Sequence, residues 1–360
     1  MTQFVDSFTT QQLLPPWQST GARFWAFVVK TAPDCMQHYL DTHFNSAGPD
    51  VAPFQYRCRD DSGYGMLIVA DHPDFSSGHE PGGKWSTLSH REVFWSFPAF
   101  QYPVNPDNLL DRPQPVWIQP FYFDDNSLVM FSSREIWGSE KQMGHIAMEE
   151  GGDAERLHID LATQGFVEFS PRSEARTLAV MHARLKPQAR PVGMEQVLLK
   201  DEKIASFAGA MLAGYNLLGN PRTATPGVLD ATEINTLKQF RDVFDMRAAV
   251  YRAIVASRVT HRNVSERTFY AGEDVELDFM WSATMAEQFE QLFGLKKPPV
   301  SGQRMGHAAE PPLRGNREAD WRLPRVRVPV EFAVRFTCDA EFDVLDTVHT
   351  YGASNPVRAG

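Results

Sequence analysis

A series of short aromatic and β-branched runs in the first half of the chain most constrains its fold. The runs are ARFWAFVVK, YGMLIVAD, EVFWSFPAF, PVWIQPFYF, SLVMFS, GFVEFS and ARTLAVMHARL, and each is bounded by Gly, Pro, Asp or Ser. Runs of this kind are typical of β-strands. Because no long helical pattern separates them, we expect strands that pair mainly antiparallel. One helix is expected early, where Pro33 and Asp34 precede apolar residues at helical spacing (Met36, Tyr39, Leu40 and Phe44).

The second half adds helices to this sheet. Apolar residues recur at three- and four-residue steps from Ile204 to Tyr215, which predicts an amphipathic helix that stops near Gly219 and Pro221. Asp230-Ala-Thr-Glu233 resembles a capping box and predicts a short helix toward Phe240.

After Phe240 the alternating pattern returns. AAVYRAIVASRVTHRNV, VELDFMW and VPVEFAVRFTCD are predicted strands, and SATMAEQFEQLFGL is a predicted helix. The fold class is therefore α+β, with one large antiparallel sheet in a single domain over residues 1–360 and a helical insertion at about 190 to 240. A Pro/Gly/Arg-rich insert at about 298 to 325 is too irregular for a helix or strand, and a lid, an oligomer arm or a disordered insert would all fit it.

Composition narrows the function classes. The formal net charge is −10 and the sequence shows no Lys/Arg stripe, so we expect no nucleic-acid partner. The N-terminus has no secretory pattern and no apolar run is long enough to cross a bilayer, so we expect a cytoplasmic protein without membrane contact. The cysteines (Cys35, Cys58 and Cys338) suggest buried thiols rather than disulfides or a thiolate metal site.

Familiar nucleotide, zinc and serine-hydrolase signatures are absent from the sequence. His158 with Asp160, and His145 with Glu149, could each be written as metal ligands. Such pairs arise by chance in a chain with 11 histidines, so we predict neither a metal nor a cofactor.

Lys141 lies in the most apolar context of any lysine in the chain. It follows QPFYFDDNSLVMF and ends SSREIWGSEK, whereas the other lysines lie in polar runs or at element ends. Composition alone would make Lys141 an ordinary edge lysine whose amine reaches water. An amine buried in apolar surroundings instead has a lowered pKa and can act as a nucleophile.

The segment SLVMFSSREIWGSEKQMG resembles the acetoacetate decarboxylase-like superfamily, in which an Arg-Glu pair precedes a Schiff-base lysine by seven residues and a glycine follows. Arg134-Glu135, Lys141 and Gly144 occupy those places. GARFWAFVVKTAPDCMQHYL, FYFDDN, HREVFWSFPAF and the closing strands are similar too, so the resemblance spans most of the chain. It implies that the sheet closes into a cone-like β-barrel and that the chain forms a homo-oligomer.

The resemblance also implies site residues. Lys141 would form the Schiff base, Glu92 would position the substrate or carry protons, Arg23 would bind a substrate carboxylate, and Tyr122 would face the pocket. Gln142 replaces the second lysine of the familiar family member, and Met66 lies near the place of a second pocket acid. Burial alone would then have to lower the pKa of Lys141.

The function implied is that of a cofactor-independent lyase that joins Lys141 to a small keto acid. Decarboxylation of a β-keto acid is placed slightly ahead of a pyruvate-type aldolase-dehydratase reaction on the same lysine. A third alternative is a non-catalytic binder of an apolar keto acid or acyl chain. A pKa of Lys141 near its ordinary value would favour the binder, because a protonated amine cannot attack a carbonyl carbon.

Overall fold

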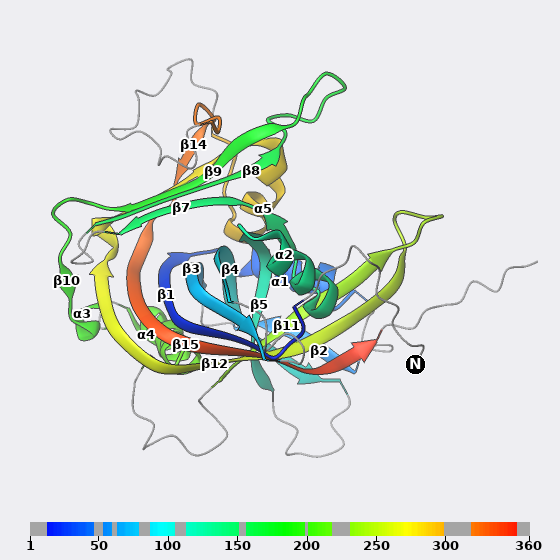
Figure 1. Ribbon diagram of the computed structural model, residues 1–360, viewed down its shortest axis with the longest axis horizontal. Helices are drawn as coiled ribbons and strands as arrows, with labels where there is room; N and C mark the ends of the chain where they lie inside the picture. The colour runs from blue at the N-terminus through cyan, green and yellow to red at the C-terminus, as the bar shows by residue number, and fades with distance from the viewer. Residues whose placement is uncertain are drawn as a thin grey trace, which may run out of the picture.

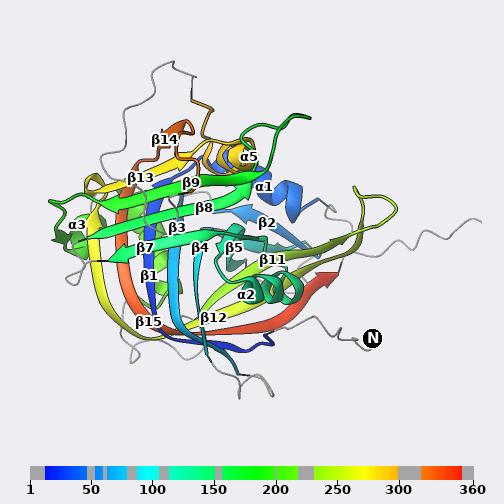
Figure 2. The ribbon, with the colours of Figure 1, turned by 45° about the horizontal axis from the view of Figure 1, so that its top comes forward.

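Two sheets of unequal size form the body of the protein (Figure 1). The computed structural model describes residues 13–46, 53–59, 63–78, 87–104, 113–150, 156–198, 201–217, 231–298 and 318–350. In Figure 2 the smaller sheet lies across the larger, strongly curved one. Each helix in the described part of the chain is too short or too polar to span a bilayer.

The large sheet has the strand order β2-β4-β3-β1-β15-β12-β11-β5-β6. Its strands are β1 (Trp17–Lys30), β2 (Phe54–Cys58), β3 (Tyr64–Ser77), β4 (Leu88–Pro103), β5 (Gln114–Asp124), β6 (Lys141–Met143), β11 (Ala231–Arg241), β12 (Ala249–Ala271) and β15 (Val330–Thr350), and the short β10 (Pro191–Val192) pairs with β12. An additional pairing of β4 with β5 closes the order into a ring of hydrogen-bonded strands. Pairing is antiparallel except between β11 and β5 and between β5 and β6. The predicted large, mainly antiparallel sheet is therefore confirmed, while the cone-like barrel shape stays a prediction.

Alternation along the strands gives the ring two different faces. On β4, Glu92 and Phe94 face the interior of the ring, whereas Val93 and Trp95 face outward to the small sheet. The pairing register places Phe24, Ala70, Glu92 and Asp124 side by side on β1, β3, β4 and β5. A row of side chains on neighbouring strands thus points into the ring.

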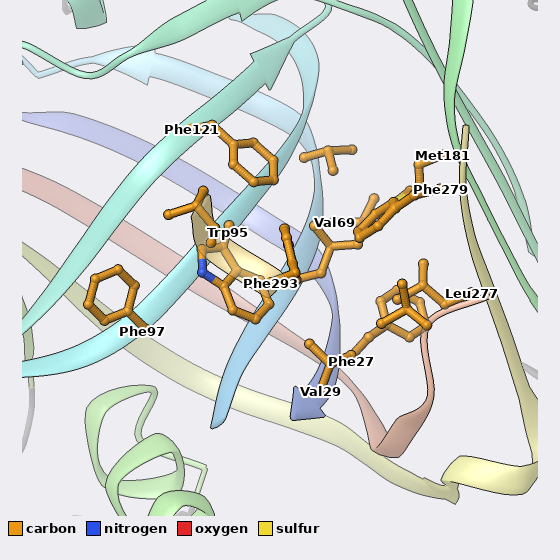
Figure 3. Close-up of a cluster of buried hydrophobic side chains, with 14 of the residues drawn as sticks. Phe27, Val29, Val69, Trp95, Phe97, Phe121, Met181, Leu277, Phe279 and Phe293 are labelled. Atoms are coloured by element: carbon orange, nitrogen blue, oxygen red, sulfur yellow. The ribbon is translucent and has the colours of Figure 1, made fainter. Parts of the chain in front are cut away.

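The small sheet covers the outside of the ring. Its order is β14-β13-β9-β8-β7, from β7 (His145–Glu150), β8 (Leu157–Gly165), β9 (Arg176–Leu185), β13 (Val275–Met280) and β14 (Arg325–Arg327). Figure 3 shows Phe27 and Trp95 of the large sheet facing Phe279 of the small sheet, with Phe293 of α5 (Ala283–Phe293) beside them. Each such buried side chain stabilises the contact by about 1.5–3 kcal/mol. This core fixes the outward face of β4 and therefore the inward direction of Glu92.

Helices pack against the two sheets. The predicted early helix is α1 (Pro33–His43) and the predicted helix from Ile204 is α4 (Glu202–Gly214), preceded by the short α3 (Met194–Leu198). Phe207 of α4 packs near Tyr64 and Trp117, so α4 belongs to the core of the ring. A single turn, η3 (Gly272–Asp274), joins β12 to β13.

Three predictions of secondary structure were wrong, one of a helix and two of strands. Residues 231–241 form β11 rather than a helix, because this segment pairs with both β12 and β5 and alternates between the two faces of the ring. The helical part of the insertion predicted at about 190 to 240 is therefore limited, among the described residues, to α3 and α4.

The run SLVMFS forms helix α2 (Ser127–Ser132) rather than a strand, because Asn126 caps its N-terminus. GFVEFS leaves the sheet at Gly165, where Phe166 and Val167 bond instead to the first turn of α5. Gly219, Pro221 and residues 299–317 of the predicted Pro/Gly/Arg-rich insert lie outside the described residues.

Candidate active site

A short helical segment delivers Lys141 to the ring. The Asn126 side chain accepts hydrogen bonds from the N–H groups of Leu128 and Val129, 3.0 and 3.4 Å away, and so starts α2. The π-helical turn η2 (Ser133–Trp137) follows and ends at Gly138, which has φ of 74°. A Cβ atom at Gly138 would lie 2.5 Å from the Cα of Lys238, so this sharp exit requires glycine.

Arg134 explains the seven-residue spacing to the lysine. One of its guanidinium N–H groups donates to the backbone carbonyl of Lys141 at 2.6 Å. Lys141 itself pairs with Tyr122 where β6 runs parallel to β5. These contacts fix the Lys141 backbone, and its side chain enters the ring with 5% exposure.

Two carboxylates surround the amine of Lys141. The Nζ atom contacts Glu92 Oε1 directly and donates to Asp124 Oδ2 at 3.0 Å. It also lies 4.9 Å from the centre of the Tyr122 ring, a favourable position for a cation. The structure thus brings together Lys141, Glu92 and Tyr122, all predicted from the sequence, and adds Asp124.

The ion pairs reverse the expected effect of burial on Lys141. Burial lowers the pKa of Lys141, but the negative charges of Glu92 and Asp124 and their hydrogen bonds raise it, and the net direction is upward. Burial also raises the pKa of Glu92, yet the Lys141 ammonium and His90 hold it well below its usual range. Burial raises the pKa of Asp124 to about 6. At rest, Lys141 is therefore an ammonium paired first with Glu92.

Two stacked histidines lie on the other side of Glu92. His90 Nε2 is 3.5 Å from Glu92 Oε1, and His72 Nε2 is 3.9 Å from Glu92 Oε2. The two rings stack at 4.6 Å with an interplanar angle of 12°. His72 Nδ1 is 2.8 Å from the hydroxyl oxygen of Ser19. Burial lowers the pKa of His72 to about 3, so this ring is neutral.

His72, His90 and Glu92 offer ligand atoms close enough for a metal ion, but their orientation does not suit one. A metal lies in the plane of each imidazole that binds it. Because these two rings are nearly parallel, their lone pairs do not converge on one point. Glu92 is moreover already paired with Lys141.

A second His–Asp–His group lies on the face of the small sheet opposite its core. His182 Nδ1 and His158 Nε2 are 2.8 and 3.3 Å from Asp160 Oδ1, so hydrogen bonds account for this arrangement. His145 and Glu149 are four residues apart on the extended β7, which separates them by about 13 Å along the strand. That pair is too far apart to share an ion.

A cavity of about 40 Å³ lies beside the Lys141 amine. A second one of about 20 Å³ adjoins it and shares Glu92 and Tyr122 with it. Each strand of the ring contributes residues to the lining of these two cavities. They are Trp17, Phe24, His72, Phe75, His90, Glu92, Phe94, Gln119, Tyr122, Ile234, Val259, His261 and Phe342. The space suits a few water molecules or part of a small substrate.

Arg23 is not part of this group. The pairing register places it with Asp71 on the outward face, next to the inward-facing Phe24. Its guanidinium pairs with Asp71 and, at 3.0 Å, with Glu150 of β7, and its side chain is 40% exposed. A side chain on this face points away from the Lys141 cavity, so the structure places Arg23 where it cannot reach a substrate in that cavity.

Sequence reasoning missed Asp124 and the histidines. Asp124 belongs to the segment FYFDDN, from which the sequence alone predicted no role for it in the site. Its carboxylate accepts a hydrogen bond from the Asn126 N–H and another from the Lys141 amine. His90 precedes Glu92 by two residues in the segment HREVFWSFPAF, and because the observed strand β4 starts at Leu88, alternation places both side chains on one face. His72 had no comparable signal, because only the β3–β4 register sets it opposite His90.

The chain is similar to several solved structures. The acetoacetate decarboxylase from Legionella pneumophila subsp. pneumophila str. Philadelphia 1 is 12% identical, with 95% of this chain and 93% of that chain covered and a TM-score of 0.44. The chain is similar to acetoacetate decarboxylase-like structures. An acetoacetate decarboxylase-like enzyme from Sphingomonas wittichii RW1 is 11% identical, with 95% and 99% covered and a TM-score of 0.48.

The enduracididine biosynthesis enzyme MppR complexed with pyruvate is 13% identical, with 96% and 95% covered and a TM-score of 0.46. No family model matches the chain, and no curated protein matches it. The activity of this chain has to be argued from its own site residues.

Proposed function

We propose that the protein is a cofactor-independent carbon–carbon lyase that forms a Schiff base between Lys141 and a small carbonyl substrate. The observation that carries the proposal is the buried Lys141 amine in contact with Glu92, beside a cavity of about 40 Å³. A buried ammonium that touches a carboxylate can pass its proton to that carboxylate without any change in net charge. The resulting neutral amine is a nucleophile.

Decarboxylation of a β-keto acid is the first candidate reaction. Lys141 attacks the ketone carbon, water leaves, and a protonated imine forms. The electrons of the breaking C–C bond then flow into this imine as carbon dioxide leaves. The enamine takes one proton, and water releases the ketone product and Lys141.

The charges of the site support this reaction. Glu92 and Asp124 are both close to the amine. Among the described residues that line the two cavities, Lys141 is the only lysine or arginine. A substrate carboxylate in this space is repelled by both acids, whereas carbon dioxide is neutral. Loss of carbon dioxide therefore relieves the repulsion.

An aldolase-dehydratase reaction on pyruvate is the second candidate. It needs groups that move protons to and from carbon and oxygen, and Asp124, Glu92 and His90 provide such groups within one buried cluster. A non-catalytic binder is the third reading. The raised pKa of Lys141 agrees with it if the Lys141 proton never moves to Glu92.

Borohydride trapping separates these readings. The protein is incubated with acetoacetate, pyruvate or acetone, reduced, and mapped by peptide mass spectrometry. A label on Lys141 is expected, with acetoacetate or pyruvate as the preferred acid indicating the reaction class. Lys141→Met is the control for specific labelling. A folded protein without any label on Lys141 would contradict the Schiff base and favour the binder.

The proposal also includes a cytoplasmic location and a homo-oligomer. Cell fractionation tests the first, and light scattering of the purified protein tests the second.

A further inference from the structure

The outer face of the small sheet carries three side chains of the types that bind metal ions, and the proposed Lys141 chemistry does not use them. His158 and Asp160 alternate along β8 with residues of the core, and strand pairing sets His182 of β9 directly opposite Asp160. The sequence offered only the pair of His158 and Asp160, which chance could explain. The pairing of β8 with β9 adds the third side chain.

The two imidazole rings of this group aim at one point. His182 Nδ1 and His158 Nε2 both donate to Asp160 Oδ1, at 2.8 and 3.3 Å, and the two rings are nearly perpendicular, at 83°. The three possible ligand atoms lie within 4.8 Å of one another. The parallel rings of His72 and His90 lack this convergence. Hydrogen bonds explain the arrangement without an ion, and they also keep the three ligand atoms assembled for one.

The charges next to the group leave room for a cation. Arginines and acids on β9, β13 and β14 pair among themselves, as Arg184 with Glu276 and as Arg325 and Arg327 with Asp278. Two further carboxylates are those of Asp160, which is completely buried, and Glu149, which is exposed and lies directly opposite His158 on β7. These groups comprise three arginines and four acids, so a bound divalent cation meets an excess of negative charge.

We propose that His158, Asp160 and His182 bind a divalent transition-metal ion, for which zinc is the probe. Two imidazoles and one carboxylate form a common ligand set for zinc and for iron(II). Each ring would bind through the nitrogen that now contacts Asp160 and would carry its proton on the other nitrogen. The His158 side chain is 14% exposed, which gives an ion a path from solvent.

Three protein ligands leave at least one position of the ion open, and water would fill it from the exposed side of His158. The small sheet and the core beneath it separate this group from Lys141. The inference therefore does not rest on the proposed Schiff base. Removal of the ion by a chelator should leave borohydride labelling of Lys141 unchanged.

Calorimetric titration of the metal-free, full-length protein with zinc chloride tests the proposal. One zinc ion should bind per chain, and cobalt(II) in its place should give the visible absorption of a four- or five-coordinate ion. His182→Gln should weaken zinc binding by more than about 100-fold, because loss of even an outer partner of a metal ligand costs about 10–100-fold. His145→Gln is the matched control, since His145 is an exposed histidine on the same face of the small sheet and should not contribute.

His72→Gln separates the two histidine groups and should bind zinc like the wild-type protein. Loss of binding in His72→Gln, with binding retained in a folded His182→Gln, would overturn the site. Circular dichroism checks the folding of each variant.

A measurement on the wild-type protein avoids any dependence on how the variants fold. Zinc should protect His158 from modification by diethyl pyrocarbonate, mapped by peptide mass spectrometry, while the exposed His145 stays reactive. Equal reactivity of His158 with and without zinc, or no zinc bound by the wild-type protein, would overturn the proposal.

Discussion

At the residue scale, burial and two neighbouring carboxylates shift the pKa of Lys141 in opposite directions. Burial was expected to lower the pKa of Lys141 by itself, and burial does act in that direction. The two carboxylates that reach the same space act in the other direction and prevail. The reactivity of this lysine therefore depends on whether Glu92 can take its proton, and not on burial alone.

Glu92→Gln should lower the pKa of Lys141. The substitution removes the carboxylate that touches the amine, while the burial of Lys141 and the hydrogen bond to Asp124 remain. NMR titration of the Lys141 side-chain carbon next to the amine measures the pKa, with Lys141→Met to assign the signal. Asp71→Asn is the control, because Asp71 pairs with Arg23 on the outward face. An unchanged titration in Glu92→Gln would show that Glu92 does not set the charge of Lys141.

Arg23→Met should leave labelling of Lys141 within about threefold of the wild-type rate for both acidic and neutral probes. Arg23 lies on the outward face of β1 and pairs with Asp71 and Glu150, so it cannot contact a ligand in the cavity. Parallel labelling with acetoacetate and acetone measures this. Loss of labelling with acetoacetate alone would restore the carboxylate-binding role that the family resemblance implies.

At the scale of elements, contacts within the segment from Asn126 to Lys141 position the Lys141 backbone. The α2 cap, the π-helical turn, Gly138 and the Arg134 bond to the Lys141 carbonyl together set where β6 begins. Since β6 is only three residues long, its own ladder bonds are few. The position of the Lys141 amine therefore depends on the turn that precedes it.

Gly138→Ala should lower the free energy of unfolding by about 3 kcal/mol, because it forces a non-glycine residue into a left-handed conformation and against the Lys238 backbone. Denaturant unfolding measures the change. Gly209→Ala on α4 is the matched control: its new Cβ meets nothing within 4 Å, and alanine should stabilise the helix by about 0.5–1 kcal/mol. Equal effects of the two substitutions would contradict the role of Gly138.

At the scale of the whole molecule, the closed ring makes the protein sensitive to acid. Burial lowers the pKa of His72 to about 3 and that of His261 to about 4. In the unfolded chain both have pKa values near 6.5. Each histidine therefore favours the folded state above about pH 6.5, and that contribution is lost as the pH falls toward the folded pKa.

The free energy of unfolding should fall by about 2 kcal/mol per histidine between pH 7 and pH 5. Urea unfolding at the two pH values measures the loss. His261→Gln removes one titrating group, so its loss between pH 7 and pH 5 should be smaller by about 2 kcal/mol than that of the wild-type protein. Equal losses in the two proteins would mean that His261 is not held neutral inside the ring.

The sequence by itself determined the strand-rich α+β class, the helices α1, α4 and α5, and the apolar surroundings of Lys141, because periodicity and apolar context are local properties. It misassigned residues 231–241, where long-range pairing with β5 and β12 outweighs a local capping pattern. Tertiary structure alone decided which groups meet. Glu92 lies 49 positions before Lys141, and strand register brings these two residues together while turning Arg23 away. A shift of one residue reverses the face of every side chain in a strand, so only the assembled ring fixes the chemistry at its centre.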